Sequence, residues 1–411
     1  MAKIIMHIDL NAFFATAETI KDPSLEGKPL IIAGSSRRGI VSTASYEARK
    51  FGIHSAMPTY MAQRLCPSVI IRNVDFELYH RLSQEFFAFV REYTSIIEIA
   101  SVDECYADMS ECMKDCKDPQ KFLEDLRDNL YKKTKLKCSI GLAPNKFLAK
   151  MASDFKKPLG VTIIRKKDIP SILWPLPIKD MYGVGKKTYP RLEALGIKTI
   201  GDLAKCEDIE VKKTLGKGFT VLKGWANGDG DDTVSTEEMD PKSIGHSSTF
   251  LFDTDDYEEI KKKLYELSLE VSEDAKKKDK VGTTISIVMK TPDFITTNRS
   301  ISINIPTNEG EIIYNNAMKL FDSNYKGNPI RLIGVTLSNL KEKENFFVQM
   351  NLFDMEKVRE ENATKLLLNE LNAKFKNKKI FIAASELEKK HEKRWSNWRI
   401  YPLYGRWTGN F

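Results

Sequence analysis

Three acidic residues of this chain have the type and spacing that can hold divalent metal ions. Asp103 and Glu104 are adjacent at the tip of an expected hairpin over residues 96–109, and Asp9 directly follows an apolar run near the start of the chain. Neighbouring carboxylates raise one another's pKa, so three that converge need a compensating cation. Divalent ions with oxygen ligands meet this need, and two such ions about 4 Å apart can catalyse an in-line phosphoryl displacement.

The elements around these acids are expected to form a small mixed sheet with helices on one face. In chain order they are a strand at 1–10, a helix at 75–93, the hairpin at 96–109, a helix at 119–133, a strand at 137–142, a helix at 145–155 and a strand at 161–164. This arrangement would place the first strand beside the hairpin, and Asp9 beside Asp103 and Glu104. The residues alone leave open whether the acids converge or belong to a solvated turn.

Residues 11–73 are expected to form a compact insert between the first strand and the first long helix of this sheet. The insert contains helices at 13–20 and 58–65 around a strand at 30–33. Tyr46 and Arg49 are three positions apart within it, about one helical turn, so their side chains can point the same way.

Residues 168–235 are expected to form short helices punctuated by glycine. Gly183 and Gly185 occupy a turn between two of these helices, expected at 178–182 and 187–195, and Lys186 and Lys187 follow directly. Such a turn fits a helix-hairpin-helix, whose backbone amides can bind a DNA phosphate with help from the two lysines. A glycine turn between two packed helices remains the alternative.

A second α+β domain is expected over residues 243–341. Its predicted elements are a strand at 244–252, a helix at 255–278, strands at 283–290 and 301–305, a helix at 309–324 and a strand at 330–337. Lysine runs on its first helix are most often only a solvated face, and a nucleic-acid surface is the alternative.

The composition indicates a multidomain globular protein. The chain has 411 residues, of which 42% are hydrophobic and 29% charged, so two to four domains are expected. We expect neither a membrane span nor a secretory signal. The six cysteines form no CxxC pair, so a zinc site is not expected and reduced cytosolic thiols are. The net charge of +7 permits a polyanionic partner.

Four motifs carry a resemblance to a known family. They are His7-Ile-Asp9-Leu-Asn-Ala-Phe13-Phe14-Ala-Thr-Ala-Glu18, Thr43-Ala-Ser-Tyr46-Glu-Ala-Arg49-Lys-Phe-Gly52, Ser101-Val-Asp103-Glu104 and Asn145-Lys146-Phe-Leu-Ala-Lys150-Met-Ala-Ser-Asp154-Phe-Lys-Lys157-Pro-Leu-Gly160. In order and spacing they resemble the Y-family translesion DNA polymerases, most closely the bacterial polymerase IV (DinB-like) branch. The resemblance covers roughly residues 1–341.

This resemblance implies an α+β, right-hand polymerase fold. Its expected parts are a ferredoxin-like palm (1–10 and 74–165), small fingers (11–73), a helix-hairpin-helix thumb (166–235), a linker (236–242), an α+β little-finger domain (243–341) and a C-terminal tail (342–411). The implied activity is template-directed, low-fidelity DNA synthesis across lesions, without a proofreading exonuclease. The small fingers also favour weak checking of the nascent base pair.

The resemblance also assigns roles to the acids. Asp9 and Asp103 look like carboxylates that bridge two Mg²⁺ ions, with the carbonyl of Leu10 as a further ligand. Glu104 looks like a ligand of the ion that activates the primer 3′-hydroxyl. One departure is Asn11, where some family members carry an acid; the three metal-binding acids are nevertheless all present.

The remaining family residues surround the incoming nucleotide. Arg49, Tyr46, Thr43 and Lys157 are expected to bind the triphosphate, because a guanidinium fork, hydroxyl donors and an ammonium suit phosphate oxygens. Phe14 looks like the steric gate, a ring under the sugar that leaves no room for a 2′-hydroxyl. Phe13 belongs to the same nucleotide site, where we expect it mainly to pack.

The family resemblance also sets the expected partners. They are primer–template DNA and deoxynucleoside triphosphates, acted on by a monomer in the bacterial cytoplasm at the nucleoid. In the tail, Gln349, Leu352 and Phe353 form a Q-x-x-L-F pattern that resembles the peptide bound by the bacterial sliding clamp. Glutamine can bond at a pocket rim while leucine and phenylalanine fill an apolar pocket.

Three rival functions fit these residues less well. A catalytically inactive Y-family adaptor would bind DNA and the clamp, but such relatives lack one or more palm acids. A nucleotidyl cyclase also uses two-metal acids on a palm-like hairpin, but it would not need the helix-hairpin-helix, the little finger or the clamp peptide. A purely structural DNA-binding module would have no use for the triphosphate residues.

Overall fold

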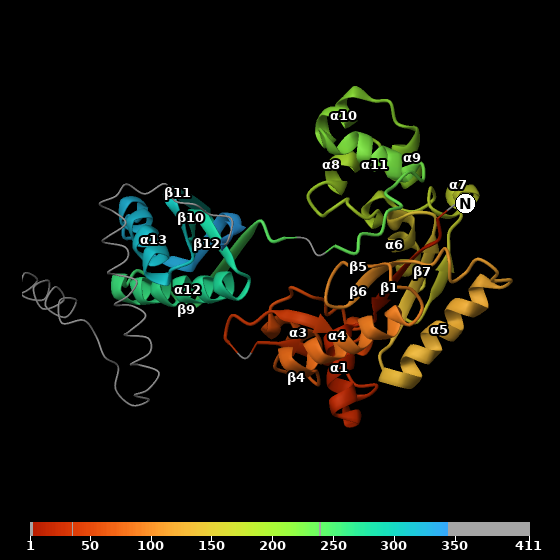
Figure 1. Ribbon diagram of the computed structural model, residues 1–411, viewed down its shortest axis with the longest axis horizontal. Helices are drawn as coiled ribbons and strands as arrows, with labels where there is room; N and C mark the ends of the chain where they lie inside the picture. The colour runs from red at the N-terminus through yellow and green to blue at the C-terminus, as the bar shows by residue number, and fades with distance from the viewer. Residues whose placement is uncertain (1–2, 35, 238–239, 344–411) are drawn as a thin grey trace, which may run out of the picture. The chain divides into compact units, whose positions relative to one another are not determined.

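The computed structural model describes residues 3–34, 36–237 and 240–343. The chain divides into two compact units, Met1–Pro241 and Lys242–Phe411, and Figure 1 shows the elements of each. Among the described residues, no helix combines the length and the apolar character needed to cross a bilayer.

A five-stranded sheet forms the centre of the first unit, in the order β5-β6-β1-β7-β8. Its strands are β1 (Ile5–Leu10), β5 (Ile97–Ile99), β6 (Glu104–Asp108), β7 (Cys138–Ala143) and β8 (Val161–Ile163). β1 is central and pairs antiparallel with both β6 and β7. The expectation that the first strand lies beside the hairpin is confirmed.

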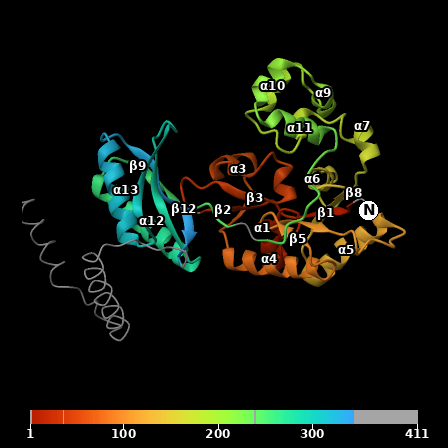
Figure 2. The ribbon, with the colours of Figure 1, turned by 45° about the horizontal axis from the view of Figure 1, so that its top comes forward.

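Side chains of β1 alternate between two hydrophobic cores, as the period of a strand requires. Met6, Ile8 and Leu10 pack with α4 (Phe76–Arg91) and α5 (Pro119–Thr134). Ile5 belongs instead to the core of α6 (Lys146–Phe155). Helices therefore cover both faces of the sheet (Figure 2), and the prediction of helices on one face was wrong. It overlooked that the apolar stripe of α6 must also be buried.

A smaller sheet with its own core lies within the segment 11–73. Three strands, β2 (Leu30–Ala33), β3 (Val41–Ala44) and β4 (Ile70–Arg72), pair in the order β3-β2-β4. The helices are α1 (Phe13–Lys21), the 3₁₀ turn η1 (Pro23–Leu25), α2 (Tyr46–Arg49) and α3 (Thr59–Leu65). β3 and β4 were not predicted, because neither has a long apolar or alternating run.

Short helices complete the first unit. They are η2 (Lys166–Asp168), α7 (Ile169–Ile172), η3 (Ile178–Asp180), α8 (Tyr189–Ala194), α9 (Ile200–Lys205), α10 (Ile209–Leu215) and α11 (Gly218–Ala226). Their apolar residues share one core with α6. The helix expected at 178–182 is only a 3₁₀ turn, confined between Pro177 and Gly183, which has a φ of +90°.

The second unit is a four-stranded antiparallel sheet with two helices. The strands β9 (Ser243–Thr254), β10 (Lys280–Lys290), β11 (Thr296–Thr307) and β12 (Ile330–Glu342) pair in the order β11-β10-β12-β9. The helices α12 (Tyr257–Lys277) and α13 (Gly310–Asn324) pack on the sheet in one core. All the predicted elements of this unit occur, and its strands are longer than expected.

Candidate active site

The pairing of β1 with β6 brings Asp9 and Glu104 together. Asp9 lies opposite Glu104 on one side and opposite Ser139 of β7 on the other. Both carboxylates are on the sheet face covered by α6, because Asp9 alternates with the core residues Ile8 and Leu10. The predicted convergence of these two acids is therefore confirmed.

Asp103 joins the site mainly through its backbone. Its carbonyl accepts a hydrogen bond from the Leu10 amide at 2.9 Å, so the hairpin tip is fixed to the end of β1. Its carboxylate accepts a hydrogen bond from the Ser101 hydroxyl at 2.6 Å. Burial raises the pKa of Asp103, and the negative charges of Asp9 and Glu104 raise it further against the opposing effect of Ser101. This is the repulsion expected of acids that share one site.

Two lysines contact the carboxylates. The Lys150 Nζ lies 3.0 Å from Asp9 Oδ2 and 2.6 Å from Glu104 Oε2, and the Lys157 Nζ lies 2.8 Å from Asp9 Oδ2. Burial alone would lower the pKa of Lys150, but the two carboxylates outweigh burial and raise it. Asp9 and Glu104 therefore have lysine ammonium groups directly against them.

His7 is a buried member of the same group. Its Nε2 lies 3.4 Å from Glu104 Oε2, and its Nδ1 lies 2.9 Å from the Ser153 hydroxyl of α6. Burial lowers the pKa of His7, so the neutral imidazole is favoured. The contact with His7, together with Lys150, holds the pKa of Glu104 below its usual range despite burial.

A metal ion would find oxygen and nitrogen donors here. Ligand atoms of His7, Asp9 and Glu104 all lie within 4.8 Å of one another, the one such group of three or more among the described residues. The Asp103 carboxylate is not in that group, because it is turned toward Ser101. Clustered carboxylate oxygens fit a divalent cation, which prefers oxygen ligands.

The predicted triphosphate residues come from two parts of the first unit. Thr43 is in β3, Tyr46 and Arg49 are in α2, and Lys157 follows α6. The Arg49 guanidinium lies 4.6 Å from the centre of the Tyr46 ring and donates to the Ala44 carbonyl at 3.0 Å. Burial raises the pKa of Tyr46, while the charges of Arg49 and Lys157 lower it, so these groups lie close enough to act together.

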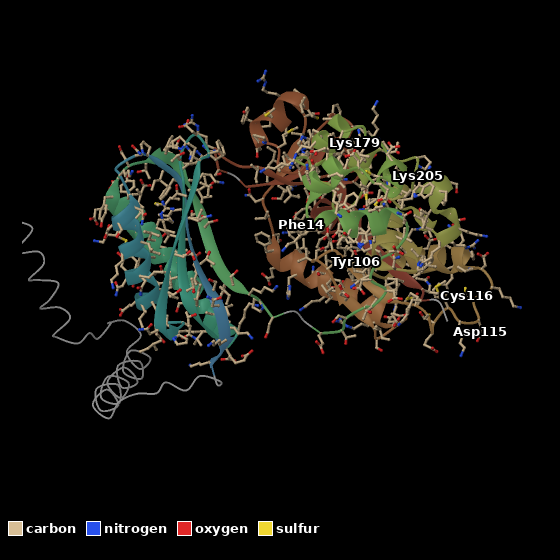
Figure 3. The ribbon with its side chains drawn as sticks, turned by 90° about the horizontal axis from the view of Figure 1, so that it is seen from above. Phe14, Tyr106, Asp115, Cys116, Lys179 and Lys205 are labelled. Carbon is tan, nitrogen blue, oxygen red and sulfur yellow. The ribbon has the colours of Figure 1, made fainter. Side chains whose placement is uncertain are left out.

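The Phe14 ring stacks on another aromatic ring, whereas the Phe13 ring is buried in the hydrophobic core. The ring of Phe14 stacks on Tyr79 of α4 at 4.3 Å between centroids and 12° between planes. The Tyr79 hydroxyl donates to the buried Glu18 carboxylate at 2.8 Å. Phe13 is only 2% exposed. Phe14 is the half-buried member of the pair and is labelled in Figure 3.

The glycine turn has the open surface that a phosphate site needs. Gly183, Gly185, Lys186 and Lys187 are all exposed. Gly183 has a positive φ, which favours glycine, and an added side chain would lie only 3.1 Å from the Trp225 ring. Gln349, Leu352 and Phe353 lie outside the described residues.

Sequence reasoning did not assign roles to His7, Lys150 or Tyr79. His7 is two positions before Asp9, and the period of a strand places both on one face, so alternation was the available signal for His7. Lys150 and Tyr79 contact residues far away in the chain, and their helices show only amphipathic spacing. No local signal marks their partners.

The sequence matches known families over most of its length. A family model described as the impB/mucB/samB family matches residues 8–154, that family's C-terminal domain matches residues 241–352, and an HHH motif of the IMS family matches residues 166–197. The last match covers the glycine turn described above.

Curated relatives and one solved structure agree with these family matches. The chain is 42% identical to DNA polymerase IV of Bacillus velezensis, over 91% of each chain. It is 40% identical to DNA polymerase IV 1 of Bacillus subtilis, over 95% of each chain. A Y-family DNA polymerase chimera superposes with a TM-score of 0.74 at 27% identity, covering 82% of this chain and 99% of that one.

Proposed function

The chain belongs to the impB/mucB/samB family of translesion DNA polymerases, and on this premise we propose that Asp9, Asp103 and Glu104 are its catalytic metal ligands. The enzyme is a DNA-directed DNA polymerase of the Y family. The observation that carries the assignment is the pairing of Asp9 with Glu104 across β1 and β6, next to the hairpin tip that holds Asp103.

The cofactor we propose is a pair of Mg²⁺ ions held by the three carboxylates and the Leu10 carbonyl. Bound there, the ions would lower the pKa of the primer 3′-hydroxyl and neutralise charge on the leaving pyrophosphate. The donor set supports this, because carboxylate oxygens of Asp9 and Glu104 lie close together, and a divalent cation prefers oxygen ligands. His7 would orient Glu104 from its buried side.

The triphosphate is bound, in this proposal, by Arg49, Tyr46, Thr43 and Lys157. A guanidinium can donate two parallel hydrogen bonds to phosphate oxygens, whereas an ammonium acts as a point charge. Lys157 contacts Asp9 and Asp154, so it is poised at the boundary between metal ligands and phosphate. Its positive charge would orient the phosphates toward the carboxylates.

Phe14 is the proposed steric gate, and Phe13 packs behind it. The stack of Phe14 on Tyr79, and the bond from Tyr79 to Glu18, support a ring whose position is fixed. Because the Phe14 ring cannot move away, it leaves no space for the 2′-hydroxyl of an incoming ribonucleotide.

The proposed division of the chain into polymerase subdomains follows from the same resemblance. We propose a palm at 1–10 and 74–165, fingers at 11–73, a thumb at 166–235 and a little finger at 243–341. Primer–template DNA is the polymer substrate, and Lys186 and Lys187 would contact its backbone beside the glycine turn. We also propose that the enzyme acts as a monomer, as the family resemblance implies. It would act in the bacterial cytoplasm at the nucleoid, where its DNA substrate is.

Gln349, Leu352 and Phe353 are proposed to bind the sliding clamp. The support is their Q-x-x-L-F pattern just beyond the last domain. The rival function, an inactive adaptor, is not favoured. Such relatives lack one or more of the three acids, and all three are present here.

Primer extension with graded Mg²⁺ tests the proposed cofactor. Wild-type enzyme with an undamaged primed template and four deoxynucleotides should extend the primer only when Mg²⁺ is present, and a chelator should abolish extension. Ca²⁺, which has longer ligand distances and looser geometry, should support DNA binding with little extension. Extension in the presence of excess chelator would overturn the metal assignment.

A further inference from the structure

We propose that Asn11 is a positioning residue that holds the loop 156–160 in place, and that it sets the affinity for the incoming triphosphate through Lys157. Asn11 is the position where this chain departs from family members that carry an acid. Nothing in the metal site requires it, yet it is 2% exposed and fully engaged in hydrogen bonds. The inference rests on the proposed role of Lys157 in binding the triphosphate.

The backbone of Asn11 is fixed on both sides. Its amide donates to the Lys137 carbonyl at 2.7 Å, just before β7. Its carbonyl accepts a hydrogen bond from the Thr16 hydroxyl of α1 at 2.8 Å. The Asn11 side chain therefore starts from a fixed point at the junction of β1, β7 and α1.

The side-chain amide of Asn11 is hydrogen-bonded to the loop 156–160. Asn11 Oδ1 accepts a hydrogen bond from the Leu159 backbone amide at 2.8 Å. The buried Ser139 hydroxyl lies 3.0 Å from Asn11 Nδ2 and 3.2 Å from Oδ1; it can pair with either atom, so the Leu159 amide, which can only donate, fixes which way the Asn11 amide faces. Because Oδ1 is aimed at Leu159, the contact depends on an acceptor at this position.

At Leu159 the loop is held by its backbone, not by its side chain. Leu159 has a φ of +64° and a side chain that is 42% exposed, so that side chain does little to anchor it. Arg127 of α5 donates to the Leu159 carbonyl at 2.8 Å, and the Gly160 carbonyl accepts from the Ile140 amide at 2.9 Å. Of the two groups that bond Leu159, Asn11 is the buried one.

Lys157 depends on this loop for its position. It is two residues before Leu159, and its ammonium reaches Asp9 Oδ2 at 2.8 Å. If the Leu159 amide lost its acceptor, the loop would be released from the end of β1 and held to β7 only through Gly160, and the backbone at Lys157 would be less fixed. The affinity for the triphosphate would therefore decrease more than the rate of the chemical step, because the metal-binding carboxylates are on other elements.

A double-mutant cycle between Asn11 and Lys157 tests this coupling. Asn11→Leu keeps a similar size but lacks the acceptor, and Lys157→Ala removes the ammonium. Asn11→Leu should raise the KM for deoxynucleotides about tenfold, the effect of about one lost hydrogen bond, with kcat within about twofold of wild type. In the Lys157→Ala background the same substitution should change KM by less than about twofold.

Matched variants separate positioning from folding. Asn11→Asp retains an acceptor oxygen and should restore most of the nucleotide affinity. Ser139→Ala removes the other partner but leaves the Leu159 contact, so KM should change less than in Asn11→Leu. Melting temperatures identify any variant that fails to fold; if Asn11→Leu fails, Asn11→Ala, which also lacks the acceptor and is smaller, replaces it in the cycle.

The outcomes are distinct. If Lys157→Ala raises KM and the Asn11→Leu effect disappears in that background, the inference stands. If the two effects multiply, Asn11 acts independently of Lys157; the inference is overturned and the role of Lys157 survives. If Lys157→Ala leaves KM unchanged, the triphosphate role of Lys157 fails, and the inference fails with it.

Discussion

Lys150 contacts two of the proposed metal ligands at once and, together with Lys157 at Asp9 and His7 at Glu104, offsets the repulsion between the carboxylates. Its ammonium is 3.0 Å from Asp9 Oδ2 and 2.6 Å from Glu104 Oε2. Two buried negative charges without such a partner would be destabilising, and one would take up a proton. Ionised carboxylates are the form that binds a divalent cation, so the lysine keeps the ligands ready for it.

Phe14 is expected to control sugar selection. Phe14→Ala should increase the ratio of ribonucleotide to deoxynucleotide kcat/KM by about 10–200-fold, the range that a steric pocket contact supplies. Single-nucleotide insertion kinetics with matched ribo- and deoxynucleotides measure the ratio. Phe76→Ala, which removes a 67% exposed ring that also contacts Tyr79, is the control. An unchanged ratio in Phe14→Ala would remove Phe14 from the role of gate.

The cysteines differ in reactivity because of their burial. Burial raises the pKa of the Cys105 thiol to about 12, so it is almost entirely protonated at neutral and mildly alkaline pH. Cys112 is exposed. Iodoacetamide in mildly alkaline buffer should therefore alkylate Cys112 and leave Cys105 unmodified in the native enzyme, as peptide mass spectrometry can show, while denaturant should expose both. Modification of native Cys105 at the rate of Cys112 would contradict the burial.

At the scale of elements, the close approach of α6 to β7 positions the cations. α6 begins after Asn145, whose Oδ1 accepts a hydrogen bond from the Leu148 amide at 2.9 Å and whose Nδ2 donates to the Gly228 carbonyl at 2.9 Å. A side chain at Gly141 of β7 would lie 2.1 Å from the Ala149 carbonyl oxygen. Glycine at this position therefore lets the helix lie directly on the strand and brings Lys150 within reach of Asp9.

Gly141→Ala tests this packing. The added methyl group must push α6 away, because its nearest contacts are backbone atoms, and overpacking of this kind costs about 1–3 kcal/mol. The melting temperature should fall by roughly 2–4 °C per kcal/mol, and the rate of primer extension should fall with it. Gly218→Ala, where nothing lies within 4 Å of the added atom, is the control. Wild-type stability and activity in Gly141→Ala would show that the close approach is not needed.

Individual contacts explain which features the sequence could predict. The Asp9–Glu104 pair was predictable only in part, because the expected sheet places β1 beside the hairpin while the residues alone left open whether the acids converge. Lys150 and Asp9 are 141 positions apart in the chain, and no sequence feature near Lys150 predicts that it contacts Asp9. The missed strand β3 is short and interrupted by Ser42 and Thr43, so it lacks the alternation that marks a strand. The second core around α6 was missed for a related reason, since an amphipathic helix does not reveal which face of a sheet it covers.

At the scale of the whole molecule, the connection between the two units is attached to the first unit for part of its length. Lys146 contacts Glu98 at 3.0 Å and Asp231 at 2.6 Å. The Ser235 amide donates to Glu98 at 2.9 Å. The segment therefore follows the first unit to residue 235, which leaves a short connection before β9 begins at Ser243.

The proposed clamp peptide should act on processivity alone. Alanine substitution of Gln349, Leu352 and Phe353 should abolish the increase in product length that the clamp produces, because tethering acts through effective concentration at the primer end. Extension without the clamp should equal that of wild type, since the active site is in the first unit. A chain truncated after residue 343 should behave as the alanine variant does. Clamp stimulation that survives the alanine substitutions would place the contact elsewhere.

The most direct test of the catalytic assignment is primer extension by Asp103→Ala beside wild type, on an undamaged primed template with Mg²⁺ and four deoxynucleotides. Asp103 is the decisive residue because its carboxylate bonds to Ser101 in the structure and yet is proposed to hold metal. Asp115→Ala, at a site labelled in Figure 3, is the matched control. We expect Asp103→Ala to bind primer–template normally but to lose extension by several powers of ten, about 4 kcal/mol or more. Wild-type extension by Asp103→Ala would refute the assignment of this carboxylate to the metal site.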